Sequence, residues 1–265
     1  TLAIDVETYS SIDIKTSGAY KYVEAPDFEI LLFGYAFNDK PVGVIDFAQG
    51  EELPQDVIDA LDDSNTIKTA FNANFERNAI AKYLNILAPP EQWQCTMVKA
   101  LTLGLPGSLD MVGKVLNFEE DKQKMKEGKA LIQYFCKPCK PTKANGGRNR
   151  NLPEHDMDKW QLFKEYNKQD VEVEREIRKL LSRYETTDKE QRLWELDQHI
   201  NDRGVNTDLK LIEQAIKCDA NYTKKLMDAA IKLTGLKNPN SPTQIKKWIG
   251  ARLGHEVKSL NKKAI

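Results

Sequence analysis

Two acidic residues, Asp5 and Glu7, alternate with apolar residues in the segment IDVET near the start of the chain. Because successive side chains of a β-strand point to opposite faces, a strand here would place both carboxylates on one face, with their Cα atoms about 6.6 Å apart. Two like charges directed at one spot repel each other unless a proton or a cation lies between them. The pattern indicates either the solvated face of an edge strand or one half of a metal site, and a metal site needs further carboxylates.

Two later segments carry side chains that could complete such a site. In FNANFERNAI, Asn72, Phe75 and Glu76 lie where a short predicted strand passes into a predicted helix. In YNKQD, Tyr166 and Asp170 are four residues apart on a predicted long helix and therefore share one of its faces. Such a pair alone is most often an exposed helical pair, so the ordered set of three motifs carries more weight than any single one.

The elements that must position these side chains are predicted to be mostly strands in the N-terminal third and helices afterwards. Short runs rich in branched and aromatic residues predict strands, and a 3.6-residue period predicts helices. Strands followed by packed helices indicate an α/β domain with a mixed sheet. We expect strands at 2–8, 29–37, 41–47 and 66–71, a helix at 53–63, and long helical patterns over 156–186 and from 189 to the end.

The segment KPCKPTKANGGRNRNL, residues 137–152, has no apolar period and carries five basic residues without an acid. It predicts a mobile loop whose cations contact phosphates by a sequence-independent attraction. The alternative is a solvated, disordered segment, and both interpretations can hold together. The candidate phosphate-binding residues are Lys137, Lys140, Lys143, Arg148 and Arg150.

The composition, with 40% hydrophobic and 30% charged residues, is that of an ordinary soluble protein that can bury a core. No apolar run approaches the roughly 20 residues of a membrane helix, and the start reads as a strand and not as a signal peptide. We therefore expect a cytoplasmic location and no membrane partner. The pair Cys136 and Cys139 resembles half of a zinc knuckle, but no second pair exists, so we do not expect zinc.

A charge bias marks the C-terminal segment. Residues 222–265 hold ten Lys or Arg against two acids, which suits a polyanionic partner. Ser241 and Pro242 form a helix start, with Ser241 as the N-cap. We place a domain boundary near Thr186–Thr187.

Taken in order, the three motifs resemble those of the DEDD exonuclease superfamily. The match is to the tyrosine-bearing proofreading 3′–5′ exonuclease domain of bacteriophage family A DNA polymerases. The resemblance covers residues 1–186 and implies a ribonuclease H-like fold with a mixed sheet flanked by helices. Residues 187–265 resemble the helical start of the polymerase thumb region. Nothing resembles the polymerase palm motifs, so we expect no polymerase activity here and regard the missing palm and fingers as partners from the same chain.

The resemblance also implies a site with two divalent cations, Mg²⁺ or Mn²⁺, held by hard oxygen ligands. Asp5, Glu7 and Asp170 would hold the first ion. Asp5 would bridge to the second, with Glu76 as its outer ligand. Most family members carry Asp at the position of Glu76, whose extra methylene shifts the carboxylate. Tyr166 would orient the attacking water, because a phenol with a pKa of about 10 is a poor base at neutral pH.

The implied substrate is the 3′ end of single-stranded DNA, since a terminal nucleotide must leave its partner strand to reach the ions. By resemblance, Thr8, Asn72 and Phe75 would contact this nucleotide, although core packing is an equal alternative for Phe75. A sister subclass uses a His as general base five residues before the last Asp, where this chain has Glu165. Two alternatives stay open, namely a catalytically weak single-strand-binding scaffold and a 3′–5′ exoribonuclease. We expect a monomer.

Overall fold

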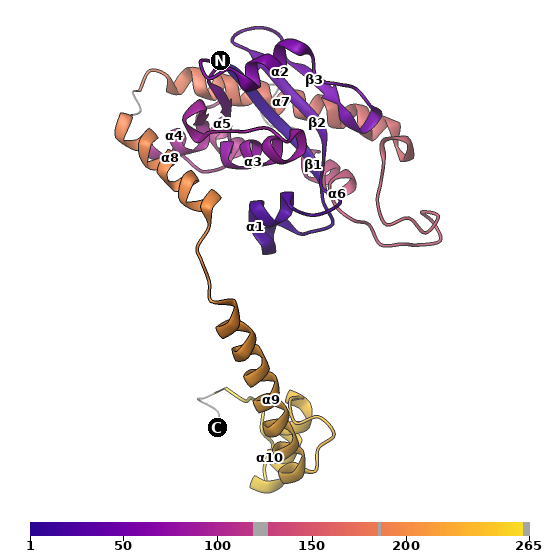
Figure 1. Cartoon of the computed structure of the whole chain (residues 1–265). Coiled ribbons are helices and arrows are strands. Elements are labelled where there is room, and N and C mark those ends of the chain that lie inside the picture. The colour runs from indigo at the N-terminus through magenta and orange to yellow at the C-terminus, as the bar shows by residue number, and fades with distance from the viewer. Residues whose placement is uncertain (119–126, 185–186, 262–265) are drawn as a thin grey trace. The chain divides into compact units, whose positions relative to one another are not determined.

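The computed structural model describes residues 1–118, 127–184 and 187–261. The chain forms two compact units, Thr1–Arg203 and Gly204–Ile265, which are described separately (Figure 1).

The first unit is built on a mixed five-stranded sheet. Its strands lie in the order β3-β2-β1-β4-β5, with β1 antiparallel to β2 and parallel to β4. At the two edges, β3 is antiparallel to β2, and β5 is parallel to β4. This is the ribonuclease H-like arrangement, so the predicted fold class is confirmed. The strands are β1 Leu2–Tyr9, β2 Glu29–Phe37, β3 Gly43–Asp46, β4 Lys68–Ala70 and β5 Trp93–Cys95.

The helices of this unit cover both faces of the sheet, and three short 3₁₀ turns lie between the elements in the described ranges. The predicted long helix over 156–186 is observed as α7, which ends earlier, at Leu181, and residues 185–186 lie outside the described ranges. The predicted helix over 53–63 is observed as α2. Neither α1 nor β5 was predicted. The helices are α1 Ile14–Val23, α2 Gln55–Asp62, α3 Ala73–Leu84, α4 Thr96–Thr102, α5 Leu109–Val115, α6 Gly128–Phe135, α7 Met157–Leu181 and α8 Asp188–Arg203, and the turns are η1 Phe47–Gln49, η2 Pro90–Gln92 and η4 Pro153–His155.

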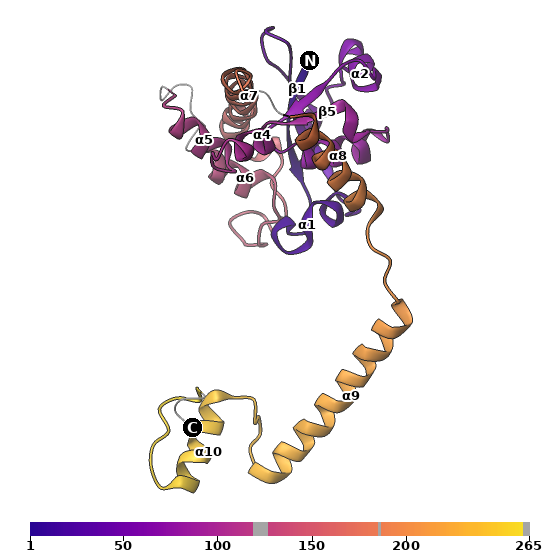
Figure 2. The same cartoon turned by 90° about the vertical axis from the view of Figure 1, so that its left-hand side faces the viewer.

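The central strand β1 is buried on both sides, which explains its nearly continuous apolar sequence. Leu2, Ile4 and Val6 join a core cluster with residues of α2 and α3. Ala3 instead packs with Val171 of α7. Figure 1 shows α3 in front of the sheet and α7 behind it, and Figure 2 shows α7 and α8 on opposite sides of β1. By the alternation of side chains, Asp5 and Glu7 share the face of Ala3 and are directed toward α7.

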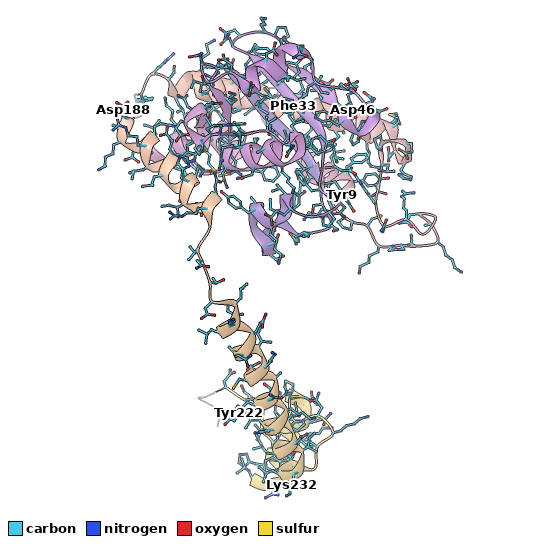
Figure 3. All side chains as sticks on the ribbon, viewed as in Figure 1. Tyr9, Phe33, Asp46, Asp188, Tyr222 and Lys232 are labelled. Atoms are coloured by element: carbon cyan, nitrogen blue, oxygen red, sulfur yellow. The ribbon has the colours of Figure 1, made fainter. Side chains whose placement is uncertain are left out.

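Polar contacts near the start of α7 help to fix its position. Asp156 caps its N-terminus by accepting a hydrogen bond from the Lys159 backbone at 3.1 Å. Trp160 Nε1 donates to Asp46 Oδ2 at 2.7 Å, and Asp46 lies at the end of β3 with its side chain fully buried (Figure 3). The bond from Trp160 to Asp46 joins α7 to the sheet, and Phe163 and Tyr166 pack in the same core cluster as Trp160.

The helix α8 belongs to the first unit. Arg77 of α3 donates two hydrogen bonds to Asp202 of α8, at 2.6 and 2.8 Å, and a third to Gln198 at 3.2 Å. Arg77 and Gln198 are buried, and so is Trp194 on the same helix. The compact unit therefore ends at Arg203, and the functional boundary near Thr186–Thr187 stays a prediction.

The second unit contains α9 Leu209–Thr234 and α10 Pro242–Leu253. As predicted, Ser241 is the N-cap of α10 and accepts a hydrogen bond from the Gln244 backbone, with Pro242 in the first turn. Tyr222 and Lys232, both labelled in Figure 3, lie on α9. No helix in the described ranges of either unit combines the length and apolar character needed to cross a membrane.

Candidate functional site

Three acids from two elements meet between β1 and α7. One carboxylate oxygen each from Asp5, Glu7 and Asp170 lies within 4.8 Å of the other two. Glu7 and Asp170 are buried, and Asp5 is half-buried. Carboxylates brought this close repel one another in the absence of a compensating positive charge. Within residues 1–118, 127–184 and 187–261, no other group of His, Cys, Asp or Glu side chains has the same closeness.

The chemistry of these donors fits a hard divalent cation. All three ligating groups are carboxylates, which suit Mg²⁺ or Mn²⁺, whereas sulfur and imidazole ligands would favour zinc. Asp5, Glu7 and Asp170 are therefore the residues that would hold such an ion.

A β-bulge follows Glu7 and redirects the end of β1. The pairing with β2 shifts between Glu7, opposite Leu32, and Thr8, opposite Ile30. Bulges of this kind often lie beside active sites because they change the direction of a side chain. Thr8 is buried, and its hydroxyl lies 3.0 Å from the hydroxyl of Tyr22. Its predicted contact with a nucleotide stays a prediction.

Tyr166 is fully buried one turn before Asp170 on α7. Its ring stacks on Phe163 with a centroid distance of 6.0 Å. Burial raises the pKa of Tyr166 far above its ordinary value of 10.0, and the charges of Glu7 and Asp170 raise it further. The phenol therefore keeps its proton at neutral pH and acts as a hydrogen-bond donor, which supports an orienting role over a basic one.

Glu76 lies near the three acids but outside their group. It is buried in the first turn of α3. Burial raises its pKa well above the ordinary value, and the negative charge of Asp5 adds to the effect. Among the described residues, its Oε2 atom has no hydrogen-bond partner. The predicted role of Glu76 as a ligand of a second ion stays a prediction.

Two buried polar residues near the site were not predicted from the sequence. Asn167 follows Tyr166 directly and donates a hydrogen bond to Asp5 Oδ2 at 2.7 Å. Glu174 lies one turn after Asp170, is buried, and accepts a hydrogen bond from Thr96. Both lie on the face of α7 that carries Tyr166 and Asp170, so their spacing from these residues was the available signal.

A cavity of about 320 Å³ adjoins Glu7 and is lined by Thr8, Phe75, Cys136 and Lys137, among other residues. Phe75 is only partly buried and packs against Tyr22 with ring centroids 6.0 Å apart. It therefore contributes to the core and to the cavity wall at once.

Asn72 is exposed at the N-terminus of α3, and its side chain makes no capping bond. The sequence predicted that a strand passes into a helix at Asn72. The structure confirms this, because β4 ends at Ala70 and α3 begins at Ala73.

The basic segment 137–152 divides into free and engaged cations. Lys140 and Lys143 are exposed, and Lys137 is half-buried beside the cavity. Arg148 donates to Asn151 Oδ1 at 2.8 Å. Arg150 forms an ion pair with Glu29 and lies over the ring of Tyr9, 3.7 Å from its centroid. Arg150 thus has partners within the chain, and the phosphate contacts of all five cations stay predictions.

The four cysteines are free. Cys136 is buried with its Sγ atom 3.9 Å from Glu7 Oε2, and Cys139 donates to the Arg148 carbonyl at 3.4 Å. The two sulfurs of the CxxC motif therefore have separate surroundings.

The sequence matches no family model. Two of the similar solved structures are an apo form of a nuclease, with 14% identity, and NrnC of Brucella melitensis, with 15% identity. The alignment with the nuclease covers 69% of this chain and 72% of the nuclease chain, with a TM-score of 0.38. The alignment with NrnC covers 71% of this chain and 89% of the NrnC chain, with a TM-score of 0.35. Both likenesses are weak, and neither bears on the function of this chain.

A far stronger similarity is found in a curated protein. All 265 residues align with a DNA polymerase of Bacillus phage SP02 at 57% identity, and the chain spans 40% of the length of that relative. The predicted resemblance to a bacteriophage DNA polymerase is thereby confirmed: this chain is a homologue of a region of a phage DNA polymerase.

Proposed function

We propose that this chain is a metal-dependent 3′–5′ exonuclease that hydrolyses the terminal phosphodiester bonds of single-stranded DNA as the proofreading part of a phage DNA polymerase. The observation that carries the proposal is the convergence of Asp5, Glu7 and Asp170 within 4.8 Å. The similarity to a phage DNA polymerase supports DNA as the substrate.

The side chains of the site have separate roles in the proposed hydrolysis. Bound divalent cations would lower the pKa of the attacking water and stabilise the charge that develops on the phosphate. Asp5 and Glu7 of β1 and Asp170 of α7 would hold one cation between them. Glu76 of α3 would add a carboxylate near Asp5. The protonated phenol of Tyr166 holds the attacking water by a hydrogen bond.

The cavity beside Glu7 is the proposed site of the terminal nucleotide. Its volume of about 320 Å³ falls at the lower end of the range for small-ligand pockets, which suits one nucleoside. Phe75 presents an aromatic ring at the wall, against which a base can stack without regard to its sequence. Lys137 at the same cavity, with exposed Lys140 and Lys143 farther along the segment, would attract the phosphates that follow.

The test uses a 5′-labelled single strand offered as DNA or as RNA of the same sequence, with Mg²⁺, Mn²⁺ or a chelator. We expect stepwise shortening of the DNA from its 3′ end with either metal and none with the chelator. Asp5→Ala should abolish shortening without unfolding the protein, because it removes a carboxylate from the group of three. Asp56→Ala, which removes an exposed acid on α2, is the matched control and should act as the parent.

Three results would contradict the proposal. Preferential shortening of RNA would indicate an exoribonuclease. Binding of the DNA strand without cleavage under any metal would indicate a scaffold. Full activity of Asp5→Ala with unchanged metal dependence would show that the site lies elsewhere.

A further inference from the structure

Gly34 occupies an unusual place in the middle of β2, directly opposite Asp5 in the antiparallel pairing with β1. A glycine inside a strand often marks a close approach of another part of the chain. A Cβ atom on Gly34 would lie 2.5 Å from Asn167 Oδ1 and 2.9 Å from Val171 Cγ2, both on α7. The missing side chain therefore makes the room that α7 occupies beside Asp5.

Asn167 uses this room to reach Asp5 from across the fold. Its side chain is fully buried, and its Nδ2 atom donates to Asp5 Oδ2 at 2.7 Å and to the Asp5 carbonyl at 3.2 Å. The amide must present its nitrogen here, because both atoms it meets are acceptors. The two residues are 162 positions apart in sequence.

We infer that Asn167 is a positioning residue that orients the carboxylate of Asp5 for a divalent cation, and that Gly34 holds Asn167 in place. The inference rests on the function proposed above. A buried donor on one carboxylate oxygen restricts rotation of the group before an ion arrives, and such outer partners commonly tune ligand geometry and affinity. An amide does so without positive charge, so the full negative charge of Asp5, Glu7 and Asp170 stays available to the cation.

The test measures Mn²⁺ binding directly, from the electron paramagnetic resonance signal of the free ion, and does not depend on catalysis. Asn167→Leu keeps the approximate side-chain size but removes the donor. Gly34→Ala displaces Asn167 without altering it. We expect both variants to bind Mn²⁺ about 10–100-fold more weakly than the parent. Val173→Ala, which removes buried packing from α7 away from β1, is the matched control and should lower the thermal unfolding midpoint but leave Mn²⁺ binding unchanged.

A double variant, Gly34→Ala with Asn167→Ala, keeps the test decisive if either single variant fails to fold. The smaller residue at position 167 removes the closer clash and leaves space into which the Val171 side chain can shift, so the double variant should fold, yet its Mn²⁺ binding should stay weak because the donor is absent.

Outcomes separate this inference from the proposed function. If the parent binds Mn²⁺ and degrades DNA while the folded variants bind the ion as tightly as the parent, the positioning role is wrong and the exonuclease proposal stands. If the parent neither binds Mn²⁺ nor degrades DNA, the proposed function itself fails.

Discussion

A Cβ atom on Gly128, the first residue of α6, would lie 1.9 Å from Cε2 of Tyr166. The ring of Tyr166 is therefore held against the bare backbone of α6 on one side and stacks on Phe163. Because the phenol is placed by packing on both sides, its position beside Asp170 depends on a glycine that no catalytic motif contains.

Gly128→Ala should displace the Tyr166 ring and lower the rate of DNA hydrolysis. Overpacking of this kind typically costs about 1–3 kcal/mol of stability, so the thermal unfolding midpoint should fall as well. Gly113→Ala in α5 is the matched control, because a Cβ there would meet Phe118 at an ordinary 3.7 Å. The control should keep its activity and should be equally or more stable, since alanine favours a helix. Normal activity in a folded Gly128→Ala variant would show that the ring position is unimportant.

Tyr166→Phe should lower the hydrolysis rate less than Asp5→Ala does. The variant keeps the ring that packs on Phe163 but loses the hydroxyl, which is protonated at neutral pH and can donate a hydrogen bond. Positioned hydrogen bonding of this kind is worth at most about 10²–10⁴-fold in rate. Mn²⁺ binding should stay as in the parent, because no carboxylate is removed. A loss as complete as that of Asp5→Ala would instead indicate that Tyr166 transfers a proton.

The pair of Arg77 and Asp202 should make stability depend on pH. Burial raises the pKa of Asp202, but hydrogen bonds from Arg77 and Tyr20 outweigh it and hold the pKa below 3.8. A carboxyl group whose pKa is lowered by folding contributes stability above its unfolded pKa of about 3.9, and this contribution is lost as pH falls through the native value. Asp202→Asn should therefore cost about 1–3 kcal/mol at pH 7, and the difference from the parent should shrink below about pH 4.

Urea unfolding of both proteins between pH 3 and pH 7 measures this difference. Asp110→Asn is the matched control, because Asp110 pairs with Lys114 at the exposed surface of α5, where such pairs contribute little. A constant difference between Asp202→Asn and the parent at every pH would contradict the electrostatic origin of the effect.

The shared face of Asp5 and Glu7 and that of Tyr166 and Asp170 could be predicted from the sequence, because each pair lies in a short local pattern. The alternation of Asp5 and Glu7 in β1 and the four-residue spacing of Tyr166 and Asp170 in α7 both depend only on the periodicity of one element. The strand β2 was predicted over its full observed length from its short run of branched and aromatic residues.

The remaining features depend on contacts between residues far apart in the sequence. The spacing of Asn167 from Asp170 placed it on the same side of the helix, but its bond to Asp5 and the room left by Gly34 could be found only once β1 and β2 were placed beside α7. Likewise, the extent of the first unit depends on Arg77 and Asp202, which are 125 positions apart. No spacing rule within one helix reports such a contact.

Glu76 is the position where the chain departs from the motif it resembles, and it gives the sharpest test of a second ion. If Glu76 binds an ion together with Asp5, Glu76→Asp should preserve or raise activity by restoring the usual ligand length. Glu76→Gln should lower activity and raise the Mg²⁺ concentration needed for half-maximal rate, because a neutral amide binds a hard dication poorly.

A purely structural role for Glu76 would give a different result. The obvious structural partner would be a neighbouring cation, but Arg77 is engaged with Asp202, and Glu76 forms no ion pair with the described residues. Its pKa is raised by burial and by the charge of Asp5, so loss of its charge alone should not destabilise the fold. Asp56→Asn is the control, since it neutralises an exposed acid on α2 away from the three acids, and its Mg²⁺ dependence should equal that of the parent. If Glu76→Gln also shows the Mg²⁺ dependence of the parent, Glu76 is not a ligand and the second ion must be held by other groups.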